Sequence, residues 1–169
     1  MLQLAGEIAE GALGYIWTPK YIKDHVLPNV ALGARRAGRD PTDVDVASLV
    51  LCSVNADRKV ARRIARINVG MYVATPGAGS VAEFMGLEDE RNALLQALMS
   101  GGLEALERAT SDTLVRHFSI CGTPDEAREQ LAEYRDVLPH VILHTPYVPP
   151  ISPQESESEF RGMVAALGP

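Results

Sequence analysis

The stretch from Val44 to Val54 limits the possible folds more than any other part of this sequence. It is almost continuously apolar and rich in Val and Leu, with early interruptions at Asp45 and Ser48. Strands of a parallel sheet that is covered on both faces have this composition, whereas a membrane-spanning helix needs about 20 apolar residues. The run therefore predicts a buried strand of a parallel sheet, whose neighbours must be joined to it by crossover helices.

Further strand and helix patterns alternate on both sides of this run. Apolar periodicity with Pro and Gly punctuation predicts strands at 12–17, 44–54 and 140–145, a brief extended run at 117–121, and helices at 2–10, 19–36, 57–73 and 154–167, with another helix opening at Thr123. Pro28 is expected to kink the second of these helices, because its ring removes a backbone hydrogen bond. Between 75 and 116 the pattern predicts several short helices, broken at Gly86 and Gly101–Gly102. We therefore expect a single α/β domain over 1–169 with about three parallel strands and an inserted helical segment.

Length and charge exclude several classes of protein. With 169 residues, of which 46% are hydrophobic, the chain can bury one core, but a complete (β/α)8 barrel takes at least about 200 residues. The net charge of -6 argues against nucleic-acid binding. The amino terminus lacks the basic region of a signal peptide, and Cys52 and Cys121 lie in apolar runs typical of reduced thiols. We therefore expect a cytoplasmic protein without nucleic-acid or membrane partners.

The start of the second helix is the best candidate for anion binding. Thr18 is predicted to cap this helix, and Lys20 adds a positive charge at the carboxyl end of a parallel strand. A hydroxyl, backbone N–H groups and an ammonium group can together bind a phosphate or carboxylate. Simple helix capping by Thr18 explains the same residues and stays open as an alternative. A similar start at Thr123 is followed by two carboxylates that would repel an anion, and it is interpreted as a capping box.

Histidine and aromatic side chains at strand ends supply further candidates. His144 lies at the predicted carboxyl end of the last strand, where active sites of α/β folds gather, whereas His140 lies at its start. His117 heads a short extended run, where its imidazole can meet an anionic ligand. Trp17 and Tyr15 can line a pocket for a planar ring, although ordinary packing explains them as well. No residue pattern indicates a metal site, a Ser-His-Asp triad or paired catalytic carboxylates, so no catalytic residue is assigned.

Three stretches together resemble one known family. They are LQLAGEIAEGALGYIWTPKYI, ARRAGRDPTDVDVASLVLCSVN and FSICGTPDEAREQLAEYRDVLPHVILHTP, in this order along residues 2 to 150. They resemble the carboxy-terminal half of the luciferase-like monooxygenase family, in its branch that uses the deazaflavin coenzyme F420. The first stretch departs from the family pattern at Glu10, where Asp is usual.

The resemblance implies a fold, a cofactor and roles for individual residues. It implies the carboxy-terminal half of a (β/α)8 TIM barrel, with the predicted strands as its sixth to eighth and a helical insertion at about 75–116. It also implies F420, or alternatively FMN, as cofactor, with Thr18, Lys20 and Trp17 on its side of the site and His117 and His144 toward a small organic substrate. The implied reaction is hydride transfer or monooxygenation.

A partial barrel raises the question of partners. The first and last strands would each lack a neighbour and would expose unpaired backbone groups. We therefore expect a homodimer, or pairing with a missing amino-terminal half that the enzyme requires. The alternative is a non-catalytic half-barrel assembly module that dimerises and can bind phosphate.

Overall fold

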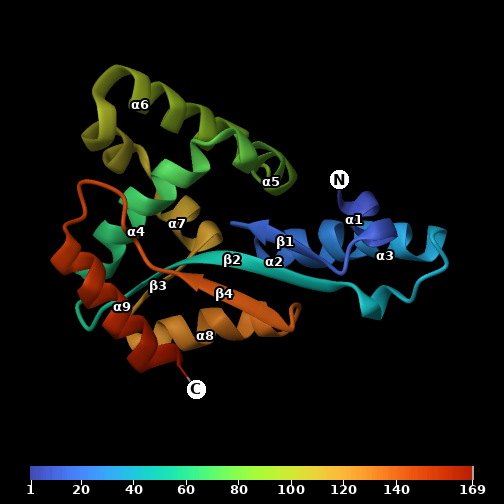
Figure 1. The fold of residues 1–169 in the computed structure, drawn as a ribbon. Helices are drawn as coiled ribbons and strands as arrows, with labels where there is room; N and C mark the ends of the chain where they lie inside the picture. Colours follow the sequence, from blue (N-terminus) through green and yellow to red (C-terminus); the bar gives the residue numbers. More distant parts are fainter. Residues whose placement is uncertain (169) are drawn as a thin grey trace.

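The computed structural model describes residues 1–168, in which helices and parallel strands alternate (Figure 1). The strands are β1 (Gly11–Tyr15), β2 (Asp45–Val54), β3 (Ser119–Gly122) and β4 (His140–His144). The α-helices are α1 (Leu2–Ile8), α2 (Pro19–Tyr21), α3 (Leu27–Arg36), α4 (Arg58–Val73), α5 (Gly79–Met85), α6 (Glu88–Ala109), α7 (Asp112–Phe118), α8 (Pro124–Arg135) and α9 (Pro153–Leu167). This order confirms the predicted α/β class and the predicted helical segment between β2 and the last strand.

Strand β2 is the centre of the sheet and pairs in parallel with all three other strands. β1 pairs with Asp45–Leu49, β4 with Ala47–Leu51 and β3 with Leu51–Val54. Because Leu51 pairs with both β3 and β4, these two strands lie on opposite sides of β2. β3 therefore continues on the side of β1, beyond the point where β1 ends. Within residues 1–168, β1 and β4 each have β2 as their single neighbour, so both outer edges are open.

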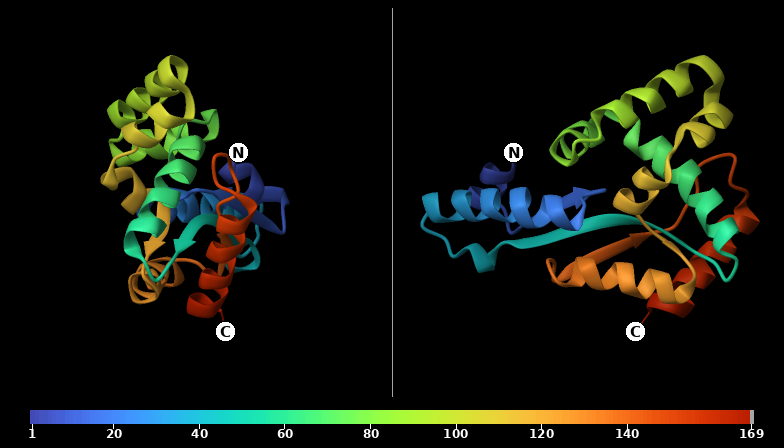
Figure 2. Two further views of the ribbon diagram at one scale, coloured as in Figure 1. Left: turned by 90° about the vertical axis from the view of Figure 1, so that its left-hand side faces the viewer. Right: turned by 180° about the vertical axis from the view of Figure 1, so that it is seen from behind.

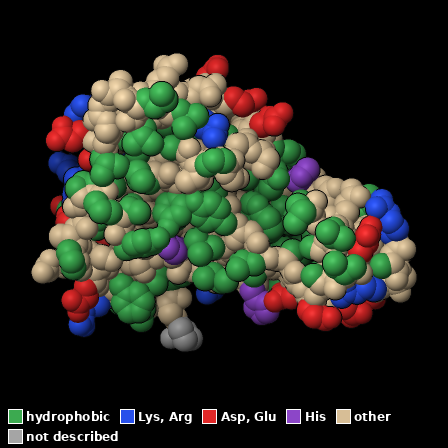
Figure 3. Space-filling view, turned by 45° about the horizontal axis from the view of Figure 1, so that its top comes forward, with side chains coloured by type: hydrophobic (Ala, Val, Ile, Leu, Met, Phe, Trp, Pro, Cys, Tyr) green, Lys and Arg blue, Asp and Glu red, His purple; other side chains and the backbone are tan. Residues whose placement is uncertain are grey.

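The two faces of the sheet differ in burial, because alternate side chains of a strand point to opposite faces. On one face, here called the helix face, Val46, Ser48 and Val50 of β2 are buried. Val46 and Val50 belong to the main hydrophobic core together with residues of α3 and α8. The other face, here called the open face, includes Leu13, Tyr15, Ala47, Leu49, Ile142 and His144, and none of these side chains is fully buried. The space-filling view of Figure 3 shows a band of hydrophobic side chains across the middle of the molecular surface.

The helix that follows β1 contains an irregular turn just before Pro28, the residue at which the sequence predicts a kink. α2 runs into a π-helical turn, Ile22–Val26, before α3 continues with Pro28 in its first turn. Pro28 lacks the N–H group that would bond the carbonyl of Asp24, and the wider π turn absorbs this loss. The Asn29 side chain adds a hydrogen bond of 2.8 Å to the carbonyl of His25.

Helix α1 packs very closely on α3, which is possible because glycine lies on both sides of the contact. A Cβ on Gly33 would lie 1.9 Å from the carbonyl oxygen of Gln3, and a Cβ on Gly6 would lie 2.1 Å from that of Val30. Side chains at these positions would force the helices apart. The right-hand view of Figure 2 shows α3 and α9 at opposite ends of β2.

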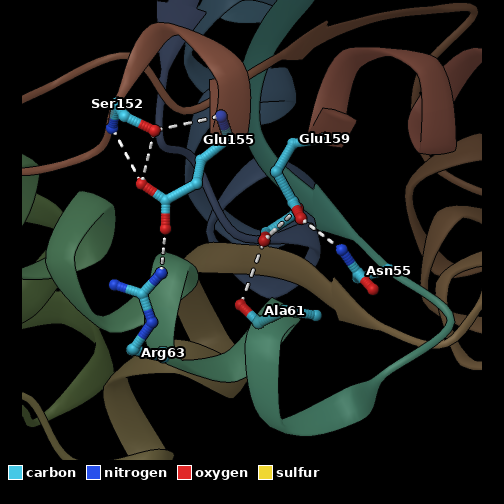
Figure 4. Close-up of polar contacts among 7 residues, drawn as sticks. Asn55, Ala61, Arg63, Ser152, Glu155 and Glu159 are labelled. Atoms are coloured by element: carbon cyan, nitrogen blue, oxygen red, sulfur yellow. Dashed lines mark hydrogen bonds and ion pairs between the residues drawn. The ribbon is translucent and has the colours of Figure 1, made fainter. Parts of the chain in front are cut away.

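Helix α9 is tied to the carboxyl end of β2 by polar contacts (Figure 4). The fully buried Glu159 carboxylate accepts hydrogen bonds from the Ser53 hydroxyl at 2.6 Å and from the Asn55 amide at 3.0 Å. At the start of the helix, Glu155 completes a capping box with Ser152 and pairs with Arg63 of α4. Backbone and side-chain donors of Ser152, with Arg63, lower the pKa of Glu155. These contacts hold α9 against β2 and α4.

Several predicted details differ from the structure. The extended run begins at Ser119, so His117 belongs to the last turn of α7 rather than to a strand, because Ser111 caps a helix over Asp112–Phe118. β1 ends at Tyr15, and Trp17 lies outside it. The run at Ser119–Gly122 is a full member of the sheet, which has four strands instead of about three. The breaks at Gly86 and Gly102 are confirmed by their positive φ angles of 69° and 61°.

No helix within residues 1–168 is both long and apolar enough to cross a bilayer.

Candidate functional site

A pocket of about 200 Å³ brings three of the predicted site residues together. Thr18 and Lys20 line it from the start of α2, and His117 and Arg116 line it from the end of α7. The sheet topology explains this meeting. β3 continues the line of β1 along β2, so the residues that precede β3 face the residues that follow β1. The walls are completed by Met85 and by Gln130, Glu133 and Tyr134 of α8.

The Thr18 hydroxyl is engaged within the protein. It accepts a hydrogen bond from the backbone N–H of Tyr21 at 3.1 Å and lies 3.3 Å from the Met85 sulfur, to which it donates. Thr18 is only 2% exposed. The structure therefore supports the capping role of Thr18 directly, and direct contact between its hydroxyl and a ligand requires Met85 to move.

Lys20 and Arg116 give the pocket its positive charge. The Lys20 ammonium group lies 2.8 Å from the Asp24 carboxylate and 4.9 Å from the centre of the Phe84 ring. Within residues 1–168, the guanidinium group of Arg116 forms no ion pair within 4.0 Å. Glu133 is the one carboxylate among the lining residues. The pocket can therefore hold a small anion between Arg116 and Lys20.

A second group of side chains meets on the open face, at the carboxyl ends of β1 and β4. This aromatic cluster consists of Tyr15, Tyr72, His144 and Tyr147. The Tyr72 ring packs edge-on against Tyr15 at 5.1 Å and against His144 at 5.6 Å between centroids. His144 lies 5.3 Å from Tyr147, whose hydroxyl accepts a hydrogen bond of 3.2 Å from the Tyr72 hydroxyl. The rings offer an apolar wall with hydroxyl groups at its rim.

The position of Tyr72 depends on how α4 ends. The Thr75 hydroxyl donates a hydrogen bond of 2.7 Å to the Tyr72 carbonyl. Arg91 of α6 donates to the carbonyls of Val73 and Thr75 at 3.2 and 3.1 Å. A cationic side chain is well suited to the negative end of a helix dipole. The inserted helices thereby hold the last turn of α4 over the open face.

Burial keeps the aromatic cluster neutral. It raises the pKa values of Tyr15 and Tyr72 and lowers that of His144. The Nδ1 atom of His144 is buried and has no hydrogen-bond partner within residues 1–168. In a neutral imidazole one ring nitrogen donates a hydrogen bond and the other accepts one. The Nδ1 atom of His144 can therefore make one hydrogen bond to a polar atom of an uncharged ligand.

The structure thus separates the predicted site residues into two places. Thr18, Lys20 and His117 meet at the pocket, whereas His144 lies in the aromatic cluster on the open face. Trp17 is not among the residues that line the pocket. Its ring covers Gly14, where a Cβ would lie 2.0 Å from Trp17 Cδ2, and it packs near Tyr21 on the helix face. His140 is exposed, and its Nδ1 atom lies within hydrogen-bond distance, 2.9 Å, of the Asp45 carboxylate.

Sequence reasoning missed Arg116, Tyr72 and Tyr147. Arg116 directly precedes the predicted site residue His117. Both lie in the last turn of α7, which continues to Phe118, two residues beyond the predicted helical segment. The low number of tyrosines is the one sequence feature that could have pointed to Tyr72 and Tyr147. The chain has five Tyr residues, and three of them meet in the aromatic cluster.

The described residues offer neither a metal cluster nor a reactive thiol. Residues 1–168 contain no group of three or more His, Cys, Asp or Glu side chains arranged to hold a metal ion. Cys52 and Cys121 are free, and burial raises the pKa of Cys121 to about 12 and that of Cys52 further. Both thiols are therefore protonated near neutral pH.

Known proteins resemble the chain in sequence over most of its length. The luciferase-like monooxygenase family matches residues 1–140. The 5,10-methylenetetrahydromethanopterin reductase of Methanolobus tindarius is 34% identical over 152 residues, which are 88% of this chain and 46% of that protein. The reductase of the same name from Archaeoglobus fulgidus is 33% identical over 138 residues, or 79% of this chain and 41% of that protein. The chain thus spans less than half the length of these curated relatives.

A solved structure resembles the chain in fold. The coenzyme F420 dependent tetrahydromethanopterin reductase of Methanopyrus kandleri superposes with a TM-score of 0.75 at 26% identity. The superposition covers 94% of this chain and 44% of that one. The four-stranded parallel sheet with its helices therefore has the fold of part of a TIM barrel, as predicted. By sequence and by fold, the chain belongs to the luciferase-like monooxygenase family.

Proposed function

We propose that this chain forms the carboxy-terminal part of an oxidoreductase site that uses coenzyme F420 and acts on a small organic substrate. The observation that carries the proposal is the aromatic cluster on the open face, at the carboxyl ends of β1 and β4. Ligands of TIM barrels bind at this end of the strands. The three relatives described above carry the names of reductases, and the M. kandleri structure is named as dependent on F420.

The aromatic cluster fits one side of a planar heteroaromatic ring. The rings of Tyr15 and Tyr72 provide an apolar wall, and aromatic faces and edges pack well on such ligands. The unpartnered Nδ1 atom of His144 is a polar group that the fold leaves without a bond, and buried polar groups without partners are rare. Together these features suit a neutral ring that carries hydrogen-bonding atoms at its edge.

The pocket of Lys20 and Arg116 suits the anionic part of such a cofactor. A bound phosphate would lie between these two cations and near His117, while Thr18 fixes the start of α2. Arg is well shaped for phosphate oxygens because its N–H groups form a planar fork. The proposal therefore keeps Thr18 and Lys20 on the cofactor side of the site and His144 toward the reacting ring. It differs from the sequence-based expectation in moving His117 from the substrate side to the cofactor side and in leaving out Trp17, which does not line the pocket.

The bound deazaflavin would supply the hydride chemistry, and the protein would supply binding, orientation and exclusion of water. Tyr72 and Tyr147 would shield the ring, and His144 would orient it or the substrate through a single hydrogen bond. FMN is the alternative cofactor, since it combines a similar ring with a phosphate. The name of the M. kandleri structure, which includes coenzyme F420, favours F420.

Titration with F420, FMN and riboflavin tests this proposal, because riboflavin has the ring of FMN without its phosphate. Fluorescence would follow binding to the chain and to a barrel completed with the remaining strands of a relative. Lys20→Ala is expected to weaken F420 and FMN binding about fivefold, equivalent to roughly 1 kcal/mol for one exposed charge contact, and to leave riboflavin unchanged. Tyr72→Ala should weaken all three ligands. If the completed barrel binds none of them, the proposed function is wrong.

A further inference from the structure

Within residues 1–168, two side chains account for every buried side-chain nitrogen or oxygen that lacks a hydrogen-bond partner. They are Asn68 of α4, whose amide nitrogen and oxygen are both unpartnered, and His144 of β4, whose Nδ1 atom is unpartnered. Asn68 is 1% exposed. Buried polar groups almost always have partners in a folded protein, and each exception calls for an explanation. The two exceptions therefore point to a polar contact that the fold itself does not supply.

Both residues lie along one stripe of α4 and the segment that follows β4. Ile64, Asn68 and Tyr72 are spaced four residues apart and so lie on one side of the helix. At one end of this stripe, the Tyr72 ring packs against His144. At the other end, Ile64 belongs to an apolar cluster with Ile151. The stripe therefore runs along the segment that joins His144 to Ile151, with Asn68 in its middle.

The Tyr72 ring is placed to cover Asn68. Long side chains of an α-helix lean toward its amino terminus, onto the residue four positions earlier. The Tyr72 hydroxyl donates a hydrogen bond to that of Tyr147, a residue that is 60% exposed. The cover is thus held at its outer end by one hydrogen bond near the surface, and turning it aside would open the stripe between Asn68 and His144.

The unpartnered atoms define the chemistry of a ligand. A carboxamide carries N–H donors and a carbonyl acceptor, and the imidazole nitrogen of His144 adds one further donor or acceptor. A group that presents an N–H beside a C=O can therefore make two hydrogen bonds with the Asn68 amide at once. The walls of the stripe are aromatic and aliphatic, so burying an ionised group there would be costly. Lactams and cyclic imides have such an edge and are uncharged.

We propose that Asn68 and His144 form a polar subsite for an uncharged ligand edge that presents N–H beside C=O, as in a lactam or cyclic imide, and that Tyr72 is its movable cover. The inference rests on the proposed function, because the rings of F420 and FMN both carry a cyclic imide. An organic substrate is the other source of the same group. Asn68 thereby determines specificity, and its unpaired amide in the free chain is the cost of that role.

Nuclear magnetic resonance on the chain alone tests the subsite without a cofactor. The side-chain amide protons of Asn68 would be followed during titration with succinimide and with N-methylsuccinimide, whose methyl group removes the N–H donor. We expect succinimide to shift these protons, and N-methylsuccinimide to bind at least about tenfold more weakly. Asn68→Leu should abolish this preference, whereas Thr110→Val, at another buried polar position, should keep it. Tyr72→Phe, which removes the hydrogen bond to Tyr147, should bind succinimide about two- to threefold more tightly.

Riboflavin and 3-methylriboflavin distinguish the two sources of the imide in the completed barrel. If the cofactor ring occupies the subsite, fluorescence titration should show a preference for riboflavin that Asn68→Leu abolishes. If a substrate occupies it, the two flavins should bind equally, and succinimide should still bind to the barrel loaded with riboflavin. Either result supports the subsite, because the same amide recognises the same edge.

Three results would overturn the proposal. Succinimide could leave the Asn68 amide protons unshifted, or Asn68→Leu could keep the preference of its parent for succinimide over the methyl derivative. Alternatively, Tyr72→Phe could bind succinimide more weakly than its parent does. Because the succinimide measurements need no cofactor, the subsite can fail while the completed barrel binds F420, and it can be confirmed when the barrel binds no cofactor. Failure of the subsite and failure of the proposed oxidoreductase function are therefore distinguishable.

Discussion

Replacing Asn68 by Leu is expected to stabilise the protein. Asn68 lies in the middle of α4 and is 1% exposed. Neither its amide nitrogen nor its amide oxygen has a hydrogen-bond partner within residues 1–168. It lies four residues before Tyr72 and therefore on the same side of the helix, which faces the open face of the sheet. The substitution removes both polar groups and keeps the branched shape of the side chain. Its two methyl groups are larger than the amide nitrogen and oxygen, and this overpacking offsets part of the gain in stability.

The magnitude follows from the cost of burying polar groups without partners. A buried donor or acceptor left unsatisfied costs about 1–3 kcal/mol, whereas an apolar group of the same shape carries no such cost. Leu also has a higher helix propensity than Asn, by a few tenths of a kcal/mol. We therefore expect the free energy of unfolding to rise by about 2 kcal/mol. With a urea m-value of about 2 kcal/mol/M, the midpoint should rise by about 1 M.

Urea denaturation followed by circular dichroism measures this change. The matched control is Thr110→Val, because Thr110 is also buried but its hydroxyl donates to the Leu106 carbonyl at 2.8 Å. The control should lower stability by about 1 kcal/mol. A fall in the midpoint for Asn68→Leu would refute the reasoning, since it would mean that the amide is satisfied, for example by a buried water. If the variant is more stable but binds the cofactor ring less tightly, Asn68 is retained for the site at a cost in stability.

Three further predictions concern the packing and charge of the fold. Glu159→Ala should lower the free energy of unfolding by about 3 kcal/mol, because two hydrogen bonds to a buried carboxylate are lost. Glu159→Gln should cost less than about 1 kcal/mol, because its amide can still accept a hydrogen bond from Asn55 and donate one to Ser53. Equal losses for the two variants in urea denaturation would contradict this prediction. Burial lowers the pKa of His144 in the folded protein below its ordinary 6.5. The imidazole therefore binds a proton more tightly in the unfolded chain, and the free energy of unfolding falls as the pH drops below about 6.5. Between about pH 7.5 and pH 5.5, the His144→Asn variant should lose less stability than the parent protein. Gly33→Ala should lower the melting temperature because its Cβ would lie 1.9 Å from the Gln3 carbonyl oxygen, whereas Gly77→Ala, whose Cβ would meet only Tyr15 at 4.0 Å, should leave it nearly unchanged.

The strands and most helices were predictable because their signals are local. The apolar run of β2, the capping residues at Thr18 and Thr123, and the glycines at 86 and 102 act within a few residues of themselves. Pro28 likewise disturbs the helix that contains it. The end of β1 was placed two residues late because Ile16 and Trp17 are as apolar as a strand requires. The deciding factor there is the backbone of Ile16, which has a positive φ of 51°.

The two candidate sites were only partly predictable, because they depend on contacts between distant parts of the chain. The meeting of Thr18 with His117 requires β3 to follow β1 along one side of β2, which no local pattern reveals. Tyr72 reaches His144 because α4 ends over the open face. The resemblance to the family pointed to Thr18, Lys20, His117 and His144, but it gave no information on which of them share a face of the sheet.

The turn at Ile16 connects the two sites and limits which ligand can use both. A β-branched residue at positive φ is strained by roughly 1–3 kcal/mol, and the fully buried Ile16 is held there by the core and by a hydrogen bond of 2.9 Å to the Leu49 carbonyl. This conformation leaves Tyr15 on the open face and sends Trp17 back over Gly14 on the helix face. A cofactor whose ring lies on the aromatic cluster can therefore reach Lys20 only around the end of β1. The chain would then select its cofactor by the length of the linker between ring and phosphate as well as by the ring itself.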